Sequence, residues 1–314
     1  MKALACAALF ALFAPELPAQ ARAEGIIVRL SGSDTVAVPA VAVVLHKVGP
    51  RQQGPVDTNV TDLRGRFRFQ FSPDSGAAFL LSTRYAGIEY FSRPISADAG
   101  HPDTAITLLV ADTSSRQPVT VRQRTLLISR PDESGTRIVI DWLVLGNRGP
   151  FTRTAPDSVR PSWGGPLPEV AQNVEMADSR LSQFAPEAIA FRTDSVLLFA
   201  PLSPGDKELM LQYRIPGELG RFRVPLVADD SVFVLMEEPR ARVVTPALTV
   251  ADSQTIEGRP FRRFAGTMAG ATELEIDLGS RGLSSGQLLV ILVGLLAAGF
   301  ALLGWRLASR PRRS

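Results

Sequence analysis

Short runs in which apolar and polar residues alternate, separated by turn-forming residues, dominate the first part of this 314-residue sequence. In the run RFRFQF at 66–71, three phenylalanines alternate with polar side chains. Successive side chains of a β-strand point to opposite faces of the sheet, so this run predicts a strand with one buried and one solvated face. Similar runs at 26–30, 41–48, 79–85 and 105–110 favour an antiparallel sandwich or barrel.

A charged turn, TDLRG at 61–65, comes directly before the RFRFQF run. Asp62 can close an Asx-type turn, and Gly65 can adopt the positive φ that such a reversal needs. Phe67 then enters the core. We therefore expect the chain to reverse here and to bury a ladder of aromatic side chains within a few residues.

The pattern T-D-x-x-G-x-F-x-F that contains this turn is formed by Thr61, Asp62, Gly65, Phe67 and Phe69. It lies between the strand-like run VAVVLHKV and the segment STRYAGIEYFS. This stretch resembles the carboxypeptidase regulatory-like domain, a transthyretin-like sandwich related to the collagen-adhesin B-type repeats. The resemblance implies a sandwich over 24–113 with a structural or binding role, and it implies no catalytic residues.

Strand-like runs resume over 117–279, where we expect a second β-sandwich domain. In TRIVIDWLVLGN at 136–147 both alternating sets are largely apolar, which predicts a strand buried on most of both faces. The following GNRG turn and a later Pro-Gly turn resemble those of immunoglobulin-like or fibronectin-like sandwiches, in architecture only. The predicted fold class is therefore all-β, with two tandem antiparallel sandwiches and one C-terminal transmembrane helix.

Residues 154–187 are rich in Pro, Gly and polar side chains and predict a long loop within the second domain. Loops of this length are often functional or mobile. Trp163, in RPSWGGPLP, is the loop residue that we select as a possible contact for a ligand or partner. A tryptophan that fills a gap over the edge of the sandwich is the alternative.

The first 23 residues have the features of a secretory signal peptide. Lys2 precedes an apolar run, and small residues at 19 and 21 and at 21 and 23 offer cleavage sites. Cys6, the one cysteine of the chain, lies in this segment. We expect the mature protein to have no cysteine, which excludes disulfides, thiol nucleophiles and Cys-ligated metals.

An uncharged segment, LLVILVGLLAAGFALLGW, extends from Leu288 to Trp305. As a helix it would be about 27 Å long at ~1.5 Å per residue, enough to cross a bilayer core. We expect a transmembrane helix over 286–305 and, by the positive-inside rule, a cytoplasmic tail over 306–314. The chain would then be a type I, single-pass bacterial membrane protein with a periplasmic or extracellular ectodomain. The basic residues of the tail are Arg306, Arg310, Arg312 and Arg313.

Small residues share one face of this predicted helix. Gly294, Ala298 and Ala301 follow the i, i+4, i+7 spacing that lets two such helices approach closely. The sequence thus supports the hypothesis of a weak self-association through this face. The general abundance of Gly and Ala in membrane helices is the alternative.

The charge distribution disfavours a nucleic-acid partner. The chain has 34 Lys+Arg and 31 Asp+Glu. Six of the basic residues and one acidic residue lie in the two terminal segments, which leaves 34 − 6 = 28 basic against 31 − 1 = 30 acidic residues between them. A general DNA-binding surface needs clustered cations, and this balance does not supply them.

Four motifs of catalytic or metal chemistry are absent from the sequence: H-E-x-x-H, the Walker loop, G-x-G-x-x-G and the EF-hand spacing. We therefore expect no catalytic residues, no metal, no cofactor and no enzymatic activity. The predicted role is an envelope protein that binds or scaffolds a protein partner or a polysaccharide at the membrane. The alternatives are a hydrolase with a carboxylate site between the domains, and an accessory factor for assembly of a membrane complex.

Overall fold

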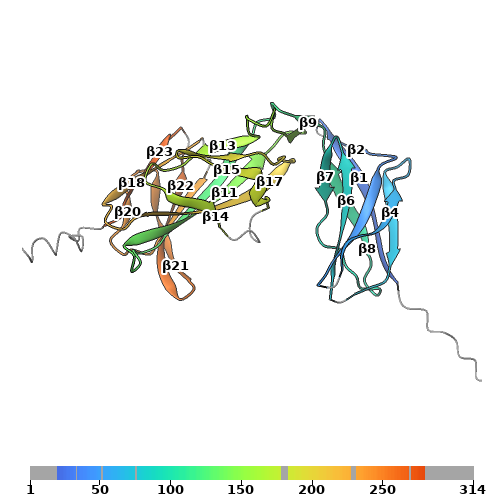
Figure 1. Ribbon diagram of the computed structural model, residues 1–314, viewed down its shortest axis with the longest axis horizontal. Helices are drawn as coiled ribbons and strands as arrows, with labels where there is room; N and C mark the ends of the chain where they lie inside the picture. The colour runs from blue at the N-terminus through green and yellow to red at the C-terminus, as the bar shows by residue number, and fades with distance from the viewer. Residues whose placement is uncertain are drawn as a thin grey trace, which may run out of the picture. The chain divides into compact units, whose positions relative to one another are not determined.

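The computed structural model describes residues 20–279, except 33, 51, 75, 178–182, 228–230 and 269. This part of the chain is built from strands β1 to β23, with one 3-10 turn, η1 (Pro186–Ala188). The all-β prediction is confirmed. The chain divides into two compact units after Thr113, coloured blue to teal and green to red in Figure 1.

The first unit contains two four-stranded sheets that enclose one core. The first sheet consists of β1 (Ala21–Ser31), β2 (Asp34–Ala37), β5 (Arg66–Phe71) and β8 (Asp103–Val110). The second consists of β4 (Gln53–Val60), β3 (Ala42–Val48), β6 (Ala78–Tyr85) and β7 (Ile88–Phe91). Strand β1 pairs in parallel with β8 and antiparallel with β2 and β5.

The alternation of apolar and polar residues in β5 decides which of its side chains enter this core. Phe67, Phe69 and Phe71 are buried, whereas the polar residues between them are exposed. They pack with buried residues of the second sheet, such as Leu45 and Leu81. The predicted division of β5 into one buried and one solvated face is therefore confirmed.

The last residues of the predicted signal peptide lie within the first strand. Ala21 and Ala23 are fully buried in the core of the first unit, and they pair with Phe71 and Phe69 of β5. Residues 1–19, which contain the rest of the predicted peptide, lie outside the described residues.

The second unit is organised around a seven-stranded sheet. In spatial order its strands are β14 (Gln172–Met176), β17 (Gly205–Pro216), β11 (Thr136–Asn147), β10 (Thr120–Ile128), β19 (Ser231–Met236), β22 (Arg259–Thr267) and β21 (Leu248–Ile256). Neighbouring strands are antiparallel except β10 and β19, which are parallel.

Smaller sheets complete the second unit. One three-stranded sheet contains β13 (Trp163–Pro166), β16 (Ser195–Leu198) and β15 (Ile189–Phe191). Another contains β18 (Arg221–Pro225), β23 (Glu273–Asp277) and β20 (Arg242–Val243). The short strands β9 (Thr113–Ser114) and β12 (Thr152–Arg153) form a pair of their own.

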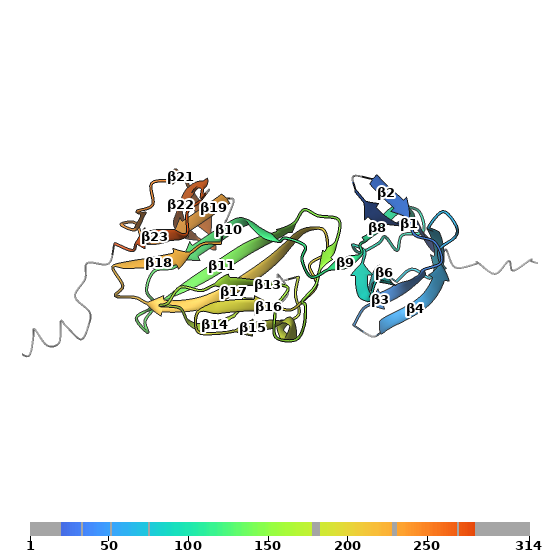
Figure 2. The same cartoon turned by 90° about the horizontal axis from the view of Figure 1, so that it is seen from above.

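Both three-stranded sheets cover the same face of the seven-stranded sheet. Val139 of β11 lies in a core with Phe222 and Ile276 of the β18 sheet. Leu143 of the same strand lies in a second core with Val196 of the β13 sheet. Residues an even number apart on a strand share a face, so the two cores lie side by side on one face. Figure 2 shows β13 and β16 toward the β9 end of this unit and β18 and β23 toward its other end. We call this face the covered face.

On the opposite face of the sheet, which we call the open face, the burial of β11 differs from the sequence prediction. That strand was predicted to be buried on most of both faces, but Ile138, Ile140, Trp142 and Val144 are only half-buried. The prediction is wrong for this face because the two smaller sheets pack on the other one. None of these four residues belongs to any of the three hydrophobic cores formed by the described residues.

The C-terminal predictions lie beyond the last described strand. Within the described ranges, the structure contains no helix of the length and apolar character that a membrane crossing requires. The predicted helix over 286–305 and the tail over 306–314 lie outside the described residues.

Removal of residues 20–23 is expected to destabilise the first unit. A chain that begins at Glu24 loses two buried alanines and the ladder bonds to β5. We expect a loss of about 1–2 kcal/mol in the free energy of unfolding, from two methyl groups and the lost hydrogen bonds. Denaturant unfolding of chains that begin at Gln20 and at Glu24 measures the difference.

A chain that begins at Ala21 is the matched control, because it lacks only the exposed Gln20. Equal stability of all three chains would show that the start of β1 contributes nothing to the fold.

Candidate functional site

The TDLRG turn of the first unit is fixed by its own hydrogen bonds. Oδ1 of Asp62 accepts hydrogen bonds from the backbone N–H groups of Arg64 and Arg66, each at 2.8 Å. These bonds, led by the one from Arg66, lower the pKa of Asp62. The backbone N–H of Gly65 donates to the Asp62 carbonyl at 2.9 Å.

Thr61 and Gly65 tie this turn to the core of the first unit. Gly65 has φ +72°, and a Cβ there would lie 2.8 Å from the carbonyl oxygen of Ile27, so a side chain is excluded by both geometry and space. The buried Thr61 hydroxyl donates to the Val38 carbonyl at 2.9 Å and accepts from the Val41 N–H at 3.1 Å. The motif residues therefore hold the chain reversal together.

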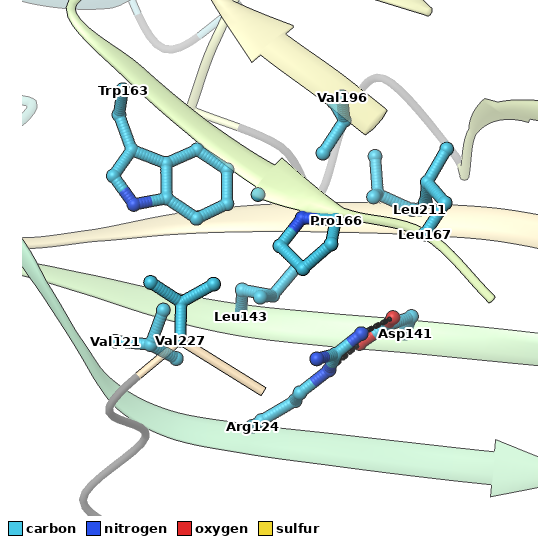
Figure 3. Close-up of a pocket in the computed structure, with 11 residues that line it drawn as sticks. Val121, Arg124, Asp141, Leu143, Trp163, Pro166, Leu167, Val196, Leu211 and Val227 are labelled. Carbon is cyan, nitrogen blue, oxygen red and sulfur yellow. Dashed lines mark hydrogen bonds and ion pairs between the residues drawn. The ribbon is translucent and has the colours of Figure 1, made fainter. Parts of the chain in front are cut away.

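A small cavity in the second unit contains the tryptophan selected from the sequence. Trp163 begins β13, and 8% of its surface is exposed. Its ring borders a cavity of about 10 Å³, which is room for about one water molecule. The cavity is drawn in Figure 3 and is lined by Val121, Arg124, Asp141, Leu143, Trp163, Gly165, Pro166, Leu167, Val196, Leu211 and Val227.

The ring of Trp163 is held in place by its neighbours on the strand. A Cβ at Gly165 would lie 2.5 Å from Cη2 of Trp163, so this position accommodates only glycine while the ring stays where it is. Trp163 also belongs to the core that includes Leu143 and Val196. This packing matches the alternative reading from the sequence, a tryptophan that fills the edge of the sandwich.

An ion pair with almost no exposure to solvent borders the same cavity. Nε and Nη2 of Arg124 donate to the two carboxylate oxygens of Asp141 at 2.9 and 2.6 Å. Nη1 of Arg124 donates to the carbonyl of Pro225, at the end of β18, at 2.7 Å. The side chains are 3% and 0% exposed. The pair lies on the covered face between the two cores, and sequence analysis did not select either residue.

Tyr213 lies close to this pair, on the neighbouring strand β17. Its hydroxyl is buried and has no hydrogen-bond partner among the described residues. Burial raises the pKa of Tyr213 well above its ordinary value, and the negative charge of Asp141 raises it further. Tyr213 is therefore a neutral phenol, and both oxygens of Asp141 are engaged by Arg124. The hydrogen bonds from Arg124 therefore stabilise the negative charge of Asp141 within the core.

The open face carries an apolar surface that sequence analysis did not identify. By strand register, one row across five strands consists of Met210, Trp142, Thr125, Phe233 and Ala265. The next row consists of Gln212, Ile140, Leu127, Leu235 and Arg263. The alternation of both residue sets in β11 was the sequence signal for this surface.

Trp142, near the middle of the open face, has an unusual environment. Its ring is only half-buried, yet the indole Nε1 is shielded from solvent and has no hydrogen-bond partner among the described residues. Indole N–H groups in such positions usually have an acceptor. The guanidinium of Arg263 lies 5.8 Å from the ring centroid of Phe233 and covers part of the same face.

Several charged residues around the open face are paired with one another, whereas Glu208 and Glu175 on the same face have no ion pair among the described residues. Arg214 contacts Asp132 at 3.1 Å, and Arg263 contacts Asp252 at 2.8 Å. Hydrogen bonds from Ser134, Thr136 and Arg214 hold the pKa of Asp132 at about 2, with Ser134 the largest cause. The edge beside β22 is therefore ion-paired, whereas the edge beside β17 and β14 also carries carboxylates without an ion pair.

The membrane-anchor residues predicted from the sequence lie outside the described ranges. They are Leu288, Trp305, Arg306, Arg310, Arg312 and Arg313, with the helix face of Gly294, Ala298 and Ala301. The sequence GLSSG at 282–286, which matches the pattern G-x-S-x-G, also lies outside the described residues. Among the residues that the structure describes, no group of three His, Cys, Asp or Glu side chains is placed to hold a metal ion.

No protein-family model matches the chain, and no curated protein matches it. A function for the protein therefore rests on the geometry of the two units described above.

Loss of one member of the buried ion pair is expected to destabilise the second unit strongly. In Asp141→Asn, the Arg124 guanidinium stays buried without a counter-charge, and we expect a loss of about 3–5 kcal/mol in the free energy of unfolding. In the double variant Arg124→Leu/Asp141→Leu the loss should be smaller than in either single variant. Denaturant unfolding measures Asp141→Asn, Arg124→Leu and the double variant.

The exposed pair Arg148 and Asp206, 3.3 Å apart, provides the matched control. Its removal should cost no more than about 1 kcal/mol, as for surface ion pairs in general. A small effect of Asp141→Asn, equal to that of Asp206→Asn, would contradict a structural role for the buried pair.

Proposed function

We propose that this protein is a non-catalytic, membrane-anchored envelope protein whose β-sheet ectodomain binds or scaffolds another macromolecule. The signal peptide, the transmembrane helix over 286–305 and the cytoplasmic tail belong to this proposal as sequence predictions. So does the assignment of the first unit as a transthyretin-like sandwich and of the second as an immunoglobulin-like one.

The observation that supports a binding role is the open face of the seven-stranded sheet. Clusters of partly exposed apolar side chains on a soluble domain generally mark interaction sites. Trp142, Phe233 and Met210 are of the residue types enriched at the centres of protein interfaces. Their half-burial leaves part of each side chain accessible.

The shape and charge of this surface favour a protein over a small molecule or a polysaccharide. Small-molecule sites are concave, with volumes of about 300–1,000 Å³. The cavity beside Trp163 has a volume of about 10 Å³, and the ion pair of Arg124 and Asp141 borders it. The open face, in contrast, is a broad sheet surface with an apolar centre and charged residues at its edge, which suits the surface of another folded protein.

Recovery of the full-length protein from its native membrane tests this proposal. After extraction in mild detergent, the wild-type chain should retain another protein chain in a fixed ratio, whether a second copy or a different protein. Phe233→Glu places a charge at the centre of the open face and should abolish that retention. Removal of 288–314 should move the protein from the membrane to the soluble fraction.

Val250→Glu is the matched control, because Val250 is 61% exposed on the edge strand β21. It should retain the companion chain. Thermal unfolding midpoints within a few degrees of wild type would show that each variant is folded. Recovery of the wild-type chain alone, in several detergents and after cross-linking in the membrane, would contradict a binding role.

A further inference from the structure

We infer that Asn59, in the first unit, is an attachment site for an N-linked oligosaccharide. The sequence N-V-T at 59–61 has the pattern N-x-[ST], the acceptor pattern for this modification in exported proteins. The other two asparagines of the chain, Asn147 and Asn173, are followed two positions later by Gly149 and Glu175. The pattern therefore occurs once in the sequence.

Asn59 lies between the edges of the two sheets of the first unit. Strand β4, which contains it, ends the second sheet, and β5 ends the first. Asn59 pairs with the buried Val43 of β3, so its side chain points to the inner side of the second sheet. From there Nδ2 of Asn59 donates to the Arg68 carbonyl of β5 at 2.9 Å. The half-buried side chain thus bridges the two edges at the rim of the sandwich.

The side-chain amide of Asn59 keeps a second N–H for a sugar. Nδ2 carries two N–H groups, and the bond to Arg68 is the one hydrogen bond that this side chain forms among the described residues. Attachment of a sugar replaces one of the two hydrogens, so the other can keep the bond to Arg68. The neighbours Thr58 and Val60 are exposed. The rim therefore accommodates the modification without loss of the contact between β4 and β5.

The environment of Thr61 requires that the transfer precede folding. In the folded unit the Thr61 hydroxyl is buried, donates to the Val38 carbonyl and accepts from the Val41 N–H. A transferase that recognises Asn59 and Thr61 together cannot reach this hydroxyl, so the acceptor is the extended chain during the export that the sequence predicts.

The sugar donor is an oligosaccharide joined through a pyrophosphate to a lipid. The bond between Nδ2 of Asn59 and C1 of the first sugar forms while the bond between C1 and the pyrophosphate oxygen breaks. The lipid pyrophosphate leaves with the electron pair, and Nδ2 loses one proton to a base of the transferase.

An oligosaccharide on Asn59 shields the edges of β4 and β5. Edge strands present unpaired N–H and C=O groups to which a strand of another chain can add. Strand β4 also exposes Val56 and Val60, which are 41% and 60% accessible. A bulky, hydrated group at the rim blocks the approach of another strand. This role in preventing edge-to-edge association goes beyond the binding role proposed for the second unit.

Peptide mass spectrometry of the full-length protein from its native membrane tests this inference. Trypsin cleavage after Arg51 and Arg64 releases QQGPVDTNVTDLR, in which Asn59 is the single asparagine. This peptide should be heavier than its sequence mass by the mass of an oligosaccharide, and electron-transfer fragmentation should place the added mass on Asn59. Recovery of the peptide at its sequence mass alone, or with the sugar on Thr58 or Thr61, would overturn the inference and leave the binding role of the second unit standing.

Two variants separate the modification from the structural roles of these residues. Asn59→Gln keeps a side-chain amide but removes the acceptor, and the full-length protein should lose the added mass. Thr61→Ser keeps the hydroxyl and the pattern, and the protein should retain the added mass. Asn173→Gln, on the edge strand β14, is the matched control and should also retain it. Added mass that persists on the 52–64 peptide of Asn59→Gln would contradict the assignment.

Light scattering tests the shielding role. The purified full-length Asn59→Gln protein in mild detergent should begin to aggregate at a lower protein concentration than Asn173→Gln. An equal onset for the two variants would overturn the shielding role.

Discussion

The buried pair of Arg124 and Asp141 is the interaction on which the second unit depends. Removing two charges from water costs several kcal/mol per ion, which only close and fully hydrogen-bonded geometry can offset. Here both carboxylate oxygens accept from the guanidinium, and the remaining terminal nitrogen donates to the Pro225 carbonyl. That third bond ties the end of β18 to the seven-stranded sheet. The pair thus fixes the position at which one covering sheet ends and the other begins.

The position of the pair also explains why the unit has two cores on one face. Asp141 lies on β11 between Val139 and Leu143, which belong to different cores. A charged pair at this point interrupts the apolar surface, so a single continuous sheet could not cover it without leaving hydrogen-bonding groups unpaired. Two shorter sheets meet there instead. Both covering sheets pack on this face, so the side chains of β11 on the opposite face remain half-buried.

Much of the first unit could be predicted from its sequence, because its strands alternate cleanly. The run RFRFQF assigns one face of β5 without reference to any other strand, and Asp62 and Gly65 have backbone requirements that few structures satisfy. Strand β1 was harder, since Ala21 and Ala23 are small residues that also suit a cleavage site. Their burial depends on pairing with β5, which lies more than 40 residues away in the chain.

The buried pair could not be predicted in the same way. Strand β10 has an irregularity between Val121 and Gln123 that shifts its alternation, so Val121 and Leu126 both face inward although their spacing is odd. If the side chains alternated regularly from Val121 onward, Arg124 would lie on the outer face, where arginine is common. Only the bulge brings it inward beside Asp141. In β11, likewise, the apolar residues on both faces are consistent with full burial of the strand. Only the structure shows that both covering sheets pack on the same face.

Two buried donors that have no hydrogen-bond partner among the described residues lie on opposite faces of the same sheet, in different surroundings. The Tyr213 hydroxyl is enclosed in a core beside Asp141, where another protein cannot reach it, and its cost is part of the folded unit. The Trp142 N–H lies on the open face, where the surrounding side chains are half-buried and belong to no core of the described residues. Its nitrogen is nevertheless shielded from solvent by its own chain, as the Tyr213 hydroxyl is. Two smaller sheets of the same chain pack on the covered face, whereas the apolar side chains of the open face belong to none of the cores formed by the described residues.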